Sequence, residues 1–224
     1  MRFRLATLAA CFALATMASE AAAQDRSGTF EVSPFAGGYF GGRLYGATAV
    51  PTGSGSTTTL SYVEPDDDFT YGVRLAYNVT RVFAFEFDWT SATTDLRAPG
   101  YYGMSARNPI VGRLRQNVYE GNTIFNFGKR RAVGYFGLGA GVANLDRTDG
   151  TFGAQNTTRF TANVSAGAKF FFTPRVGLRF DGRYRAINQT DGSNSSCDRH
   201  SYCNDQWNHW SYNAELTGGL IFAF

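Results

Sequence analysis

The chain of 224 residues contains few of the residues that most often carry chemistry, with three cysteines, two histidines and six prolines. No catalytic constellation stands out. Beyond residue 23 no segment of useful length repeats apolar residues with the period of an amphipathic helix. Charge is also nearly balanced: 21 basic and 18 acidic residues become 19 and 17, a net charge of +2, once residues 1–23, with two arginines and one glutamate, are set aside. This balance excludes the basic surface of a nucleic-acid-binding protein.

A strict alternation of side chains is abundant instead, and the segment from Phe69 to Trp89 shows it best. Large apolar residues occupy every second position on both sides of a tight turn at Thr80-Arg81, and polar or charged residues such as Arg74 and Glu86 fill the positions between. A period of two places the two sets on opposite faces of a β-hairpin. Aromatic residues on one face and charges on the other are typical of a membrane barrel, whose outside meets lipid and whose inside is polar.

The first 23 residues have the features of a secretory signal peptide. Arg2 and Arg4 precede an apolar stretch, and a small-residue site at Ala21–Ala23 predicts cleavage before Gln24. The apolar stretch is too short to cross a bilayer as a helix. Leu8–Cys11 resembles a lipobox, but cleavage there would leave hardly any apolar segment before the cysteine. We therefore expect a signal peptide at 1–23 and one barrel domain at 24–224.

The spacing of alternating segments predicts eight antiparallel strands joined by alternately short and long connections, which is the pattern of outer-membrane barrels. The expected strands are Thr29–Arg43 (with an uncertain register), Phe69–Val79, Phe83–Trp89, Leu114–Phe127, Gly134–Leu145, Arg159–Phe172, Val176–Ile187 and Trp210–Phe224. The expected long external connections are Leu44–Asp67, Asp95–Gly112, Asp146–Thr158 and Asn188–His209. An even strand number places both termini in the periplasm.

The C-terminal segment resembles the signal that the outer-membrane barrel assembly machinery recognises, with Gly219, Phe222 and the terminal Phe224. Together with the strand pattern, this makes residues 24–224 similar to the small OmpA/OmpX-type family of outer-membrane β-barrels. The resemblance implies an all-β, eight-stranded, up-and-down transmembrane barrel in the outer membrane of a Gram-negative bacterium. It further implies roles in membrane integrity, adhesion, resistance to host defences or minor solute passage, and it supplies no catalytic residue.

The outward positions of the aromatic residues assign ten charged residues to the barrel interior. An eight-stranded barrel is only wide enough for its own side chains, so this balanced set predicts a network of ion pairs that fills the interior. A narrow pore is the alternative. The ten residues are Arg74, Glu86, Asp88, Glu120, Lys169, Arg179, Asp181, Arg183, Arg185 and Glu215. We also assign Gly137, Gly139 and Gly141 to the interior, where they would make room for the long basic side chains.

The last long connection contains Cys197 and Cys203, for which export predicts a disulfide. The spacing of these cysteines around Asp198 and His200 matches no standard zinc pattern, so we expect no metal and no cofactor. The acidic run at 64–68 is interpreted as a solvated charge cluster, with a divalent-cation site as the alternative.

His209 and Ser211, with Glu215 as an acidic partner, are similar to the catalytic residues of outer-membrane lipid A deacylases. All three have inward parity, however, whereas a lipid substrate would approach from outside. We therefore expect a non-enzymatic, monomeric protein that contacts outer-membrane lipid and lipopolysaccharide and binds any surface ligand through its external loops. A narrow channel is the second hypothesis, and a lipid A-modifying hydrolase is the third.

Overall fold

The computed structural model describes residues 26–51, 57–97, 110–129, 131–149, 155–189 and 210–224. These residues form ten strands: β1 (Phe30–Phe40), β2 (Leu44–Pro51), β3 (Thr57–Pro65), β4 (Asp68–Asn78), β5 (Phe83–Arg97), β6 (Ile110–Lys129), β7 (Ala132–Asp149), β8 (Gln155–Phe171), β9 (Val176–Asn188) and β10 (Trp210–Ala223). Within these ranges, no helix is long and apolar enough to cross a membrane. The signal peptide and the two cysteines lie outside the described residues.

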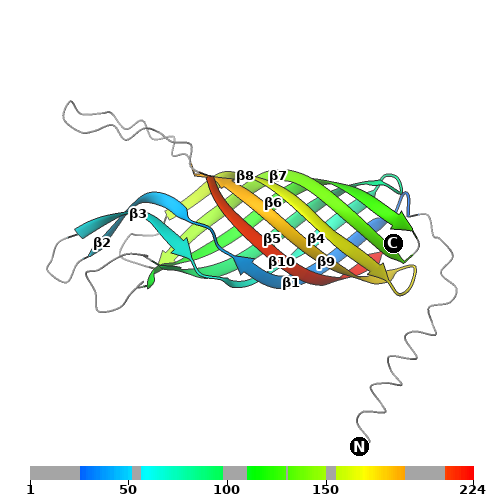
Figure 1. The fold of residues 1–224 in the computed structure, drawn as a ribbon, viewed down its shortest axis with the longest axis horizontal. Helices are drawn as coiled ribbons and strands as arrows, with labels where there is room; N and C mark the ends of the chain where they lie inside the picture. The colour runs from blue at the N-terminus through cyan, green and yellow to red at the C-terminus, as the bar shows by residue number, and fades with distance from the viewer. Residues whose placement is uncertain (1–25, 52–56, 98–109, 130, 150–154, 190–209) are drawn as a thin grey trace, which may run out of the picture.

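Eight of the strands close into an antiparallel barrel, which confirms the predicted fold (Figure 1). The order around the barrel is β1, β4, β5, β6, β7, β8, β9, β10, and β1 closes the ring by pairing with β10. Pro34 pairs with Val73 of β4. Phe35 points inward, so the register that the sequence left uncertain is set by Glu31, Ser33 and Phe35 facing the interior.

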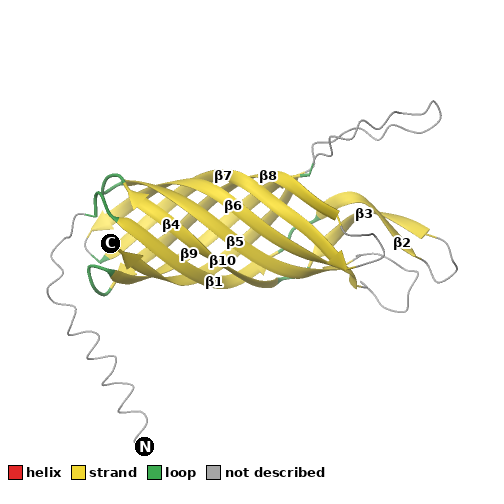
Figure 2. Cartoon of the chain, turned by 180° about the vertical axis from the view of Figure 1, so that it is seen from behind, coloured by secondary structure: helices red, strands yellow, loops and turns green. Residues whose placement is uncertain are grey.

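The two ends of the barrel differ. Phe30 and Phe224 exchange backbone hydrogen bonds of 3.2 and 2.9 Å at one end, where the short connections also lie (Figure 2). We call this the turn end. The hairpin of β2 and β3 projects from the opposite end, which we call the loop end (Figure 1).

We had expected residues Leu44–Asp67 to form a long external loop, but most of this connection is regular sheet. Leu44–Pro51 and Thr57–Pro65 pair with each other as β2 and β3, and Glu64–Pro65 pair with Leu96–Arg97 of β5. Threonine, valine and tyrosine favour extended structure, and the pairing prolongs the hairpin that β1 and β4 already form. The barrel thus carries two strands beyond the eight predicted.

Several barrel strands also extend farther toward the loop end than predicted. β6 has 20 residues and β7 has 18, whereas a tilted strand needs about 9–11 to cross the hydrocarbon layer. Residues 95–97 and 110–112, expected in a loop, belong to β5 and β6, and residues 146–149 belong to β7. The barrel therefore continues beyond the membrane as regular sheet.

The polarity of the wall reverses in this extension. Between this extension and the turn end, phenylalanine and leucine side chains face outward and charged side chains face inward. Above the cross-strand pair Trp89–Tyr119, the residues of β5 and β6 exposed on the outside include Thr93, Asp95, Arg97, Asn117, Arg115 and Arg113. The interior at this level holds a buried apolar cluster of Leu96, Leu114, Val118, Ala143, Leu145 and Ile187. An apolar inside and a polar outside are what a barrel in water requires, so the reversal marks where the protein leaves the membrane.

Candidate functional site

The structure places all ten charged residues named above inside the barrel, each at most 3% exposed. Alternation along each strand brings them there: on β9, for example, Arg179, Asp181, Arg183 and Arg185 are buried while Phe180 and Tyr184 are exposed. The strands that carry the acidic partners lie across the barrel or beside β9. The side chains thus meet in a column along the barrel axis.

Arg183 lies at the centre of this column. Its guanidinium nitrogens are 3.4 Å from Glu86, 3.3 Å from Asp88 and 3.2 Å from Glu120, and Nε is 3.6 Å from Asp181. The three acids on β5 and β6 therefore share one cation from the opposite wall. A buried charge is tolerated only when it is paired in this way.

Each of those acids also has a cation of its own. Arg179 binds Glu86 through two guanidinium nitrogens, Arg74 Nε is 2.8 Å from Asp88, and Arg185 Nε is 2.9 Å from Glu120. Arg74 additionally reaches Asp181 at 3.1 Å, and Arg185 reaches Glu215. Arg74–Asp88 and Arg185–Glu215 join adjacent strands, whereas Arg74 and Asp181 are 107 positions apart in the sequence and join strands that are not neighbours.

Three interior residues of the network were not named from the sequence. Glu31 of β1 binds Lys169 at 2.7 Å, and Arg26, 3.9 Å from Glu31, lies at the turn end of the column. Tyr135 donates to Asp181 and receives a hydrogen bond of 2.8 Å from Arg179. Glu31 was missed because the register of the first strand was open. Phe136 was assigned to the outside, so the alternation along the strand would have assigned its neighbour Tyr135 to the interior.

The interior glycines of β7 make room for neutral side chains, not for the basic ones that we had expected. A Cβ on Gly139 would lie 1.8 Å from Asn122 Oδ1, and one on Gly137 would lie 2.5 Å from Ser165 Oγ. Asn163 donates to Asn122 at 2.9 Å across this strand. The glycines therefore let polar side chains of β6 and β8 meet over β7.

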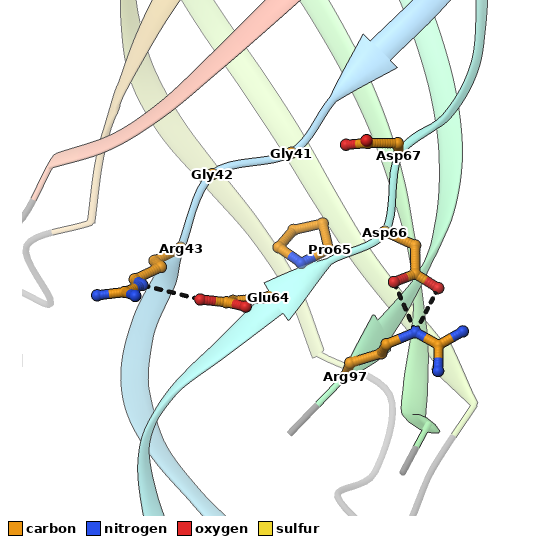
Figure 3. Close-up of a pocket in the computed structure, with 8 residues that line it drawn as sticks. All are labelled: Gly41, Gly42, Arg43, Glu64, Pro65, Asp66, Asp67 and Arg97. Carbon is orange, nitrogen blue, oxygen red and sulfur yellow. Dashed lines mark hydrogen bonds and ion pairs between the residues drawn. The ribbon is translucent and has the colours of Figure 1, made fainter. Parts of the chain in front are cut away.

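An open cavity of about 510 Å³ lies at the loop end, where the β2–β3 hairpin joins the barrel (Figure 3). It forms because β1 and β3 each stop before the next strand begins, leaving Gly41–Arg43 facing Glu64–Asp67. Arg43 Nε is 2.8 Å from Glu64, and Arg97 Nε is 2.6 Å from Asp66 (Figure 3). These guanidinium groups engage two carboxylates of the acidic run, and Asp68 accepts a hydrogen bond of 2.6 Å from the Phe69 amide. Among the described residues no group of three or more potential metal ligands is positioned to hold an ion.

The residues of the deacylase hypothesis do not face lipid where they are described. Ser211 is 2% exposed and inside the barrel, and Glu215 is bound to Arg185. His209 lies outside the described residues. Gly219 and Phe222 lie among the last residues of β10, at the turn end, Phe224 follows the strand directly, and the two phenylalanines are exposed on the outside.

An aromatic, exposed outer wall around a charged interior defines an integral membrane β-barrel. A family model for the outer membrane protein beta-barrel domain matches residues 7–215, and the chain belongs to this family. It is an outer-membrane protein. No curated protein sequence matches the chain.

Solved structures with the same fold include outer-membrane proteins of distant sequence. Neisserial surface protein A is 15% identical, with a TM-score of 0.54 over 88% of this chain and 100% of that one. OprG from Pseudomonas aeruginosa is 12% identical, with a TM-score of 0.57 over 89% and 97%. AlkL, solved in lipid bilayers, is 16% identical, with a TM-score of 0.53 over 91% and 93%. At these identities the similarity establishes the fold.

Proposed function

We propose that the protein is a closed, non-enzymatic outer-membrane barrel that strengthens the membrane or binds partners through its loop end. The observation that carries this proposal is the filled interior: a column of ion pairs, with Arg183 at its centre, spans the barrel from one wall to the other. Ions would have to pass both this column and the apolar cluster around Leu114 at the loop end. Both regions consist of buried side chains.

We infer the orientation from the same features. The extension beyond Trp89 and Tyr119 has the polar outer surface of a protein in water, and the longest connections leave from it. Phe30 and Phe224 both lie at the turn end. In the proposed orientation this end faces the periplasm and the β2–β3 hairpin lies on the cell surface. Recognition by loops and hairpins on a rigid scaffold then accounts for function.

A narrow channel is the second candidate, and one observation favours it. Asn122 Nδ2, Asn163 Oδ1 and Ser165 Oγ are buried without a hydrogen-bond partner, and all three lie beside the interior glycines of β7. Buried polar atoms of this kind are commonly satisfied by water. Water in this region would provide part of a conducting path.

Single-channel conductance of the folded protein in a planar bilayer separates the two candidates. We expect no discrete openings from protein whose folding is verified by the mobility difference between boiled and unboiled samples on a gel. Reproducible openings would replace the closed barrel with the channel. A hydrolase would instead change the mass spectrum of lipid A in cells that carry the protein, and we expect an unchanged spectrum.

A further inference from the structure

The outer wall of the barrel contains a hollow that the interior network does not explain. A cavity of about 510 Å³ lies across β4, β5 and β6, with Leu75, Tyr77, Phe85 and Phe87 around it. Phe30 of β1 borders it at one side. Glu86 and Asn122 belong to the same stretch of wall, but both residues are 3% exposed and face the interior. The outward-facing lining is therefore apolar except for Thr123 of β6.

Gly121 creates this hollow. It is the outward-facing cross-strand partner of Phe87, which is itself paired with Leu75. A Cβ added to Gly121 would meet no heavy atom within 4 Å. A glycine beside these exposed rings thus leaves an open space in the wall.

The hollow is closed toward the turn end and open toward the loop end. The Phe30 and Tyr77 rings, 4.7 Å apart, close the first side. Beyond Gly121 the paired positions on β7 and β8 are Ala140 and Ala162, whose side chains are too small to block the way. The cross-strand row Leu75, Phe87, Gly121, Ala140 and Ala162 runs obliquely across the wall. Leu75 lies three residues from the end of β4 at the turn end, whereas Ala162 lies nine residues from the end of β8 at the turn end, so the row approaches the loop end as it passes from β4 to β8.

The geometry points to an acyl chain of a lipid from the loop-end leaflet as the occupant of this hollow. The hollow lies on the lipid-facing wall below the Trp89–Tyr119 level, where hydrocarbon is the surrounding medium. A chain entering over Ala162 and Ala140 would reach Gly121 and end against Phe30. The identity of this lipid depends on the proposed function, in which the loop end faces the outside of the cell. In that orientation the lipid is the lipid A part of lipopolysaccharide.

Filling the hollow tests the inference. Gly121→Leu adds a side chain where no atom interferes, and its matched control is Gly182→Leu on the same outer wall, where an added Cβ makes only an ordinary contact of 3.4 Å with Leu216. The full chain is folded in detergent and titrated with purified lipid A, with a phospholipid titration in parallel. Because the leucine side chain would displace the acyl chain from van der Waals contacts that are individually weak, lipid A should bind Gly121→Leu about two- to fivefold more weakly, while the control binds as the wild type does.

Three results would overturn the inference. Equal affinities in wild type and Gly121→Leu would show that no chain occupies the hollow. Phospholipid that binds as tightly as lipid A would refute the assignment to the loop-end leaflet. A wild-type dimer that Gly121→Leu dissociates would make a second copy of the protein the occupant. Because both substitutions lie on the outer wall, none of these results depends on whether the interior conducts.

Discussion

Removal of the central cation tests whether the interior network holds the barrel together. Arg183→Met keeps most of the side-chain volume and deletes a charge within 3.2 to 3.6 Å of four carboxylates, namely Glu86, Asp88, Glu120 and Asp181. Each carboxylate retains another arginine, so the variant does not leave any acid wholly unpaired. It leaves one excess negative charge distributed over a buried cluster.

Breaking a buried ion pair by removing one partner costs about 3–5 kcal/mol. We expect Arg183→Met to lower the free energy of unfolding by about this amount, measured by urea titration of the folded protein with tryptophan fluorescence. The matched control is Arg113→Met at the loop end, where the arginine side chain is 54% exposed and lies 3.2 Å from Asp95. An exposed pair contributes about 0–1 kcal/mol, so the control should unfold almost as the wild type does.

If uncompensated charge is the cause of the destabilisation, removing one carboxylate should partly reverse it. Adding Glu86→Gln to Arg183→Met restores the charge balance, so the double variant should be more stable than the sum of the two single losses by about 0.5–3 kcal/mol. Additive losses, or equal losses in Arg183→Met and Arg113→Met, would refute the reasoning. The interior would then owe its stability to packing rather than to compensated charge.

Other predictions concern the two polarity regimes and the chain ends. Leu114→Ala, inside the loop-end cluster, should destabilise the barrel by about 2–5 kcal/mol in the same titration, whereas Leu138→Ala on the lipid face should cost much less because lipid fills the space. Phe87→Arg should cost about 2–4 kcal/mol and Thr93→Arg about 0–1 kcal/mol, because only the first lies in the hydrocarbon; equal costs would disprove the membrane boundary at Trp89. The two cysteines of the last connection should resist thiol alkylation until a reductant is added, as mass spectrometry would show. Deleting Phe224 should reduce the amount of folded barrel in the outer membrane of cells, seen by heat-dependent gel mobility, while protein refolded in detergent should be unaffected.

The barrel could be predicted from the sequence because its dominant signal is local. Outward aromatics such as Phe85 and Phe87 alternate with inward charges such as Glu86 and Asp88, and this parity alone assigns each residue to one face. Which charges pair could not be predicted, because pairing depends on the stagger between strands. Arg74 meets Asp181, 107 positions away, only after the barrel closes.

The sequence failed at the loop end for a physical reason rather than for lack of signal. The alternation with apolar residues facing out ends near Trp89, so the sequence predicted the end of β5 there and a loop from Asp95 onward. Thr94, Leu96 and Leu114 still alternate with Asp95 and Arg113, but with the apolar residues facing in. A strand that passes from lipid into water must reverse its pattern, since the medium outside it changes while the period of two does not. The position of that reversal, and not the end of alternation, therefore locates the membrane surface in a barrel of this kind.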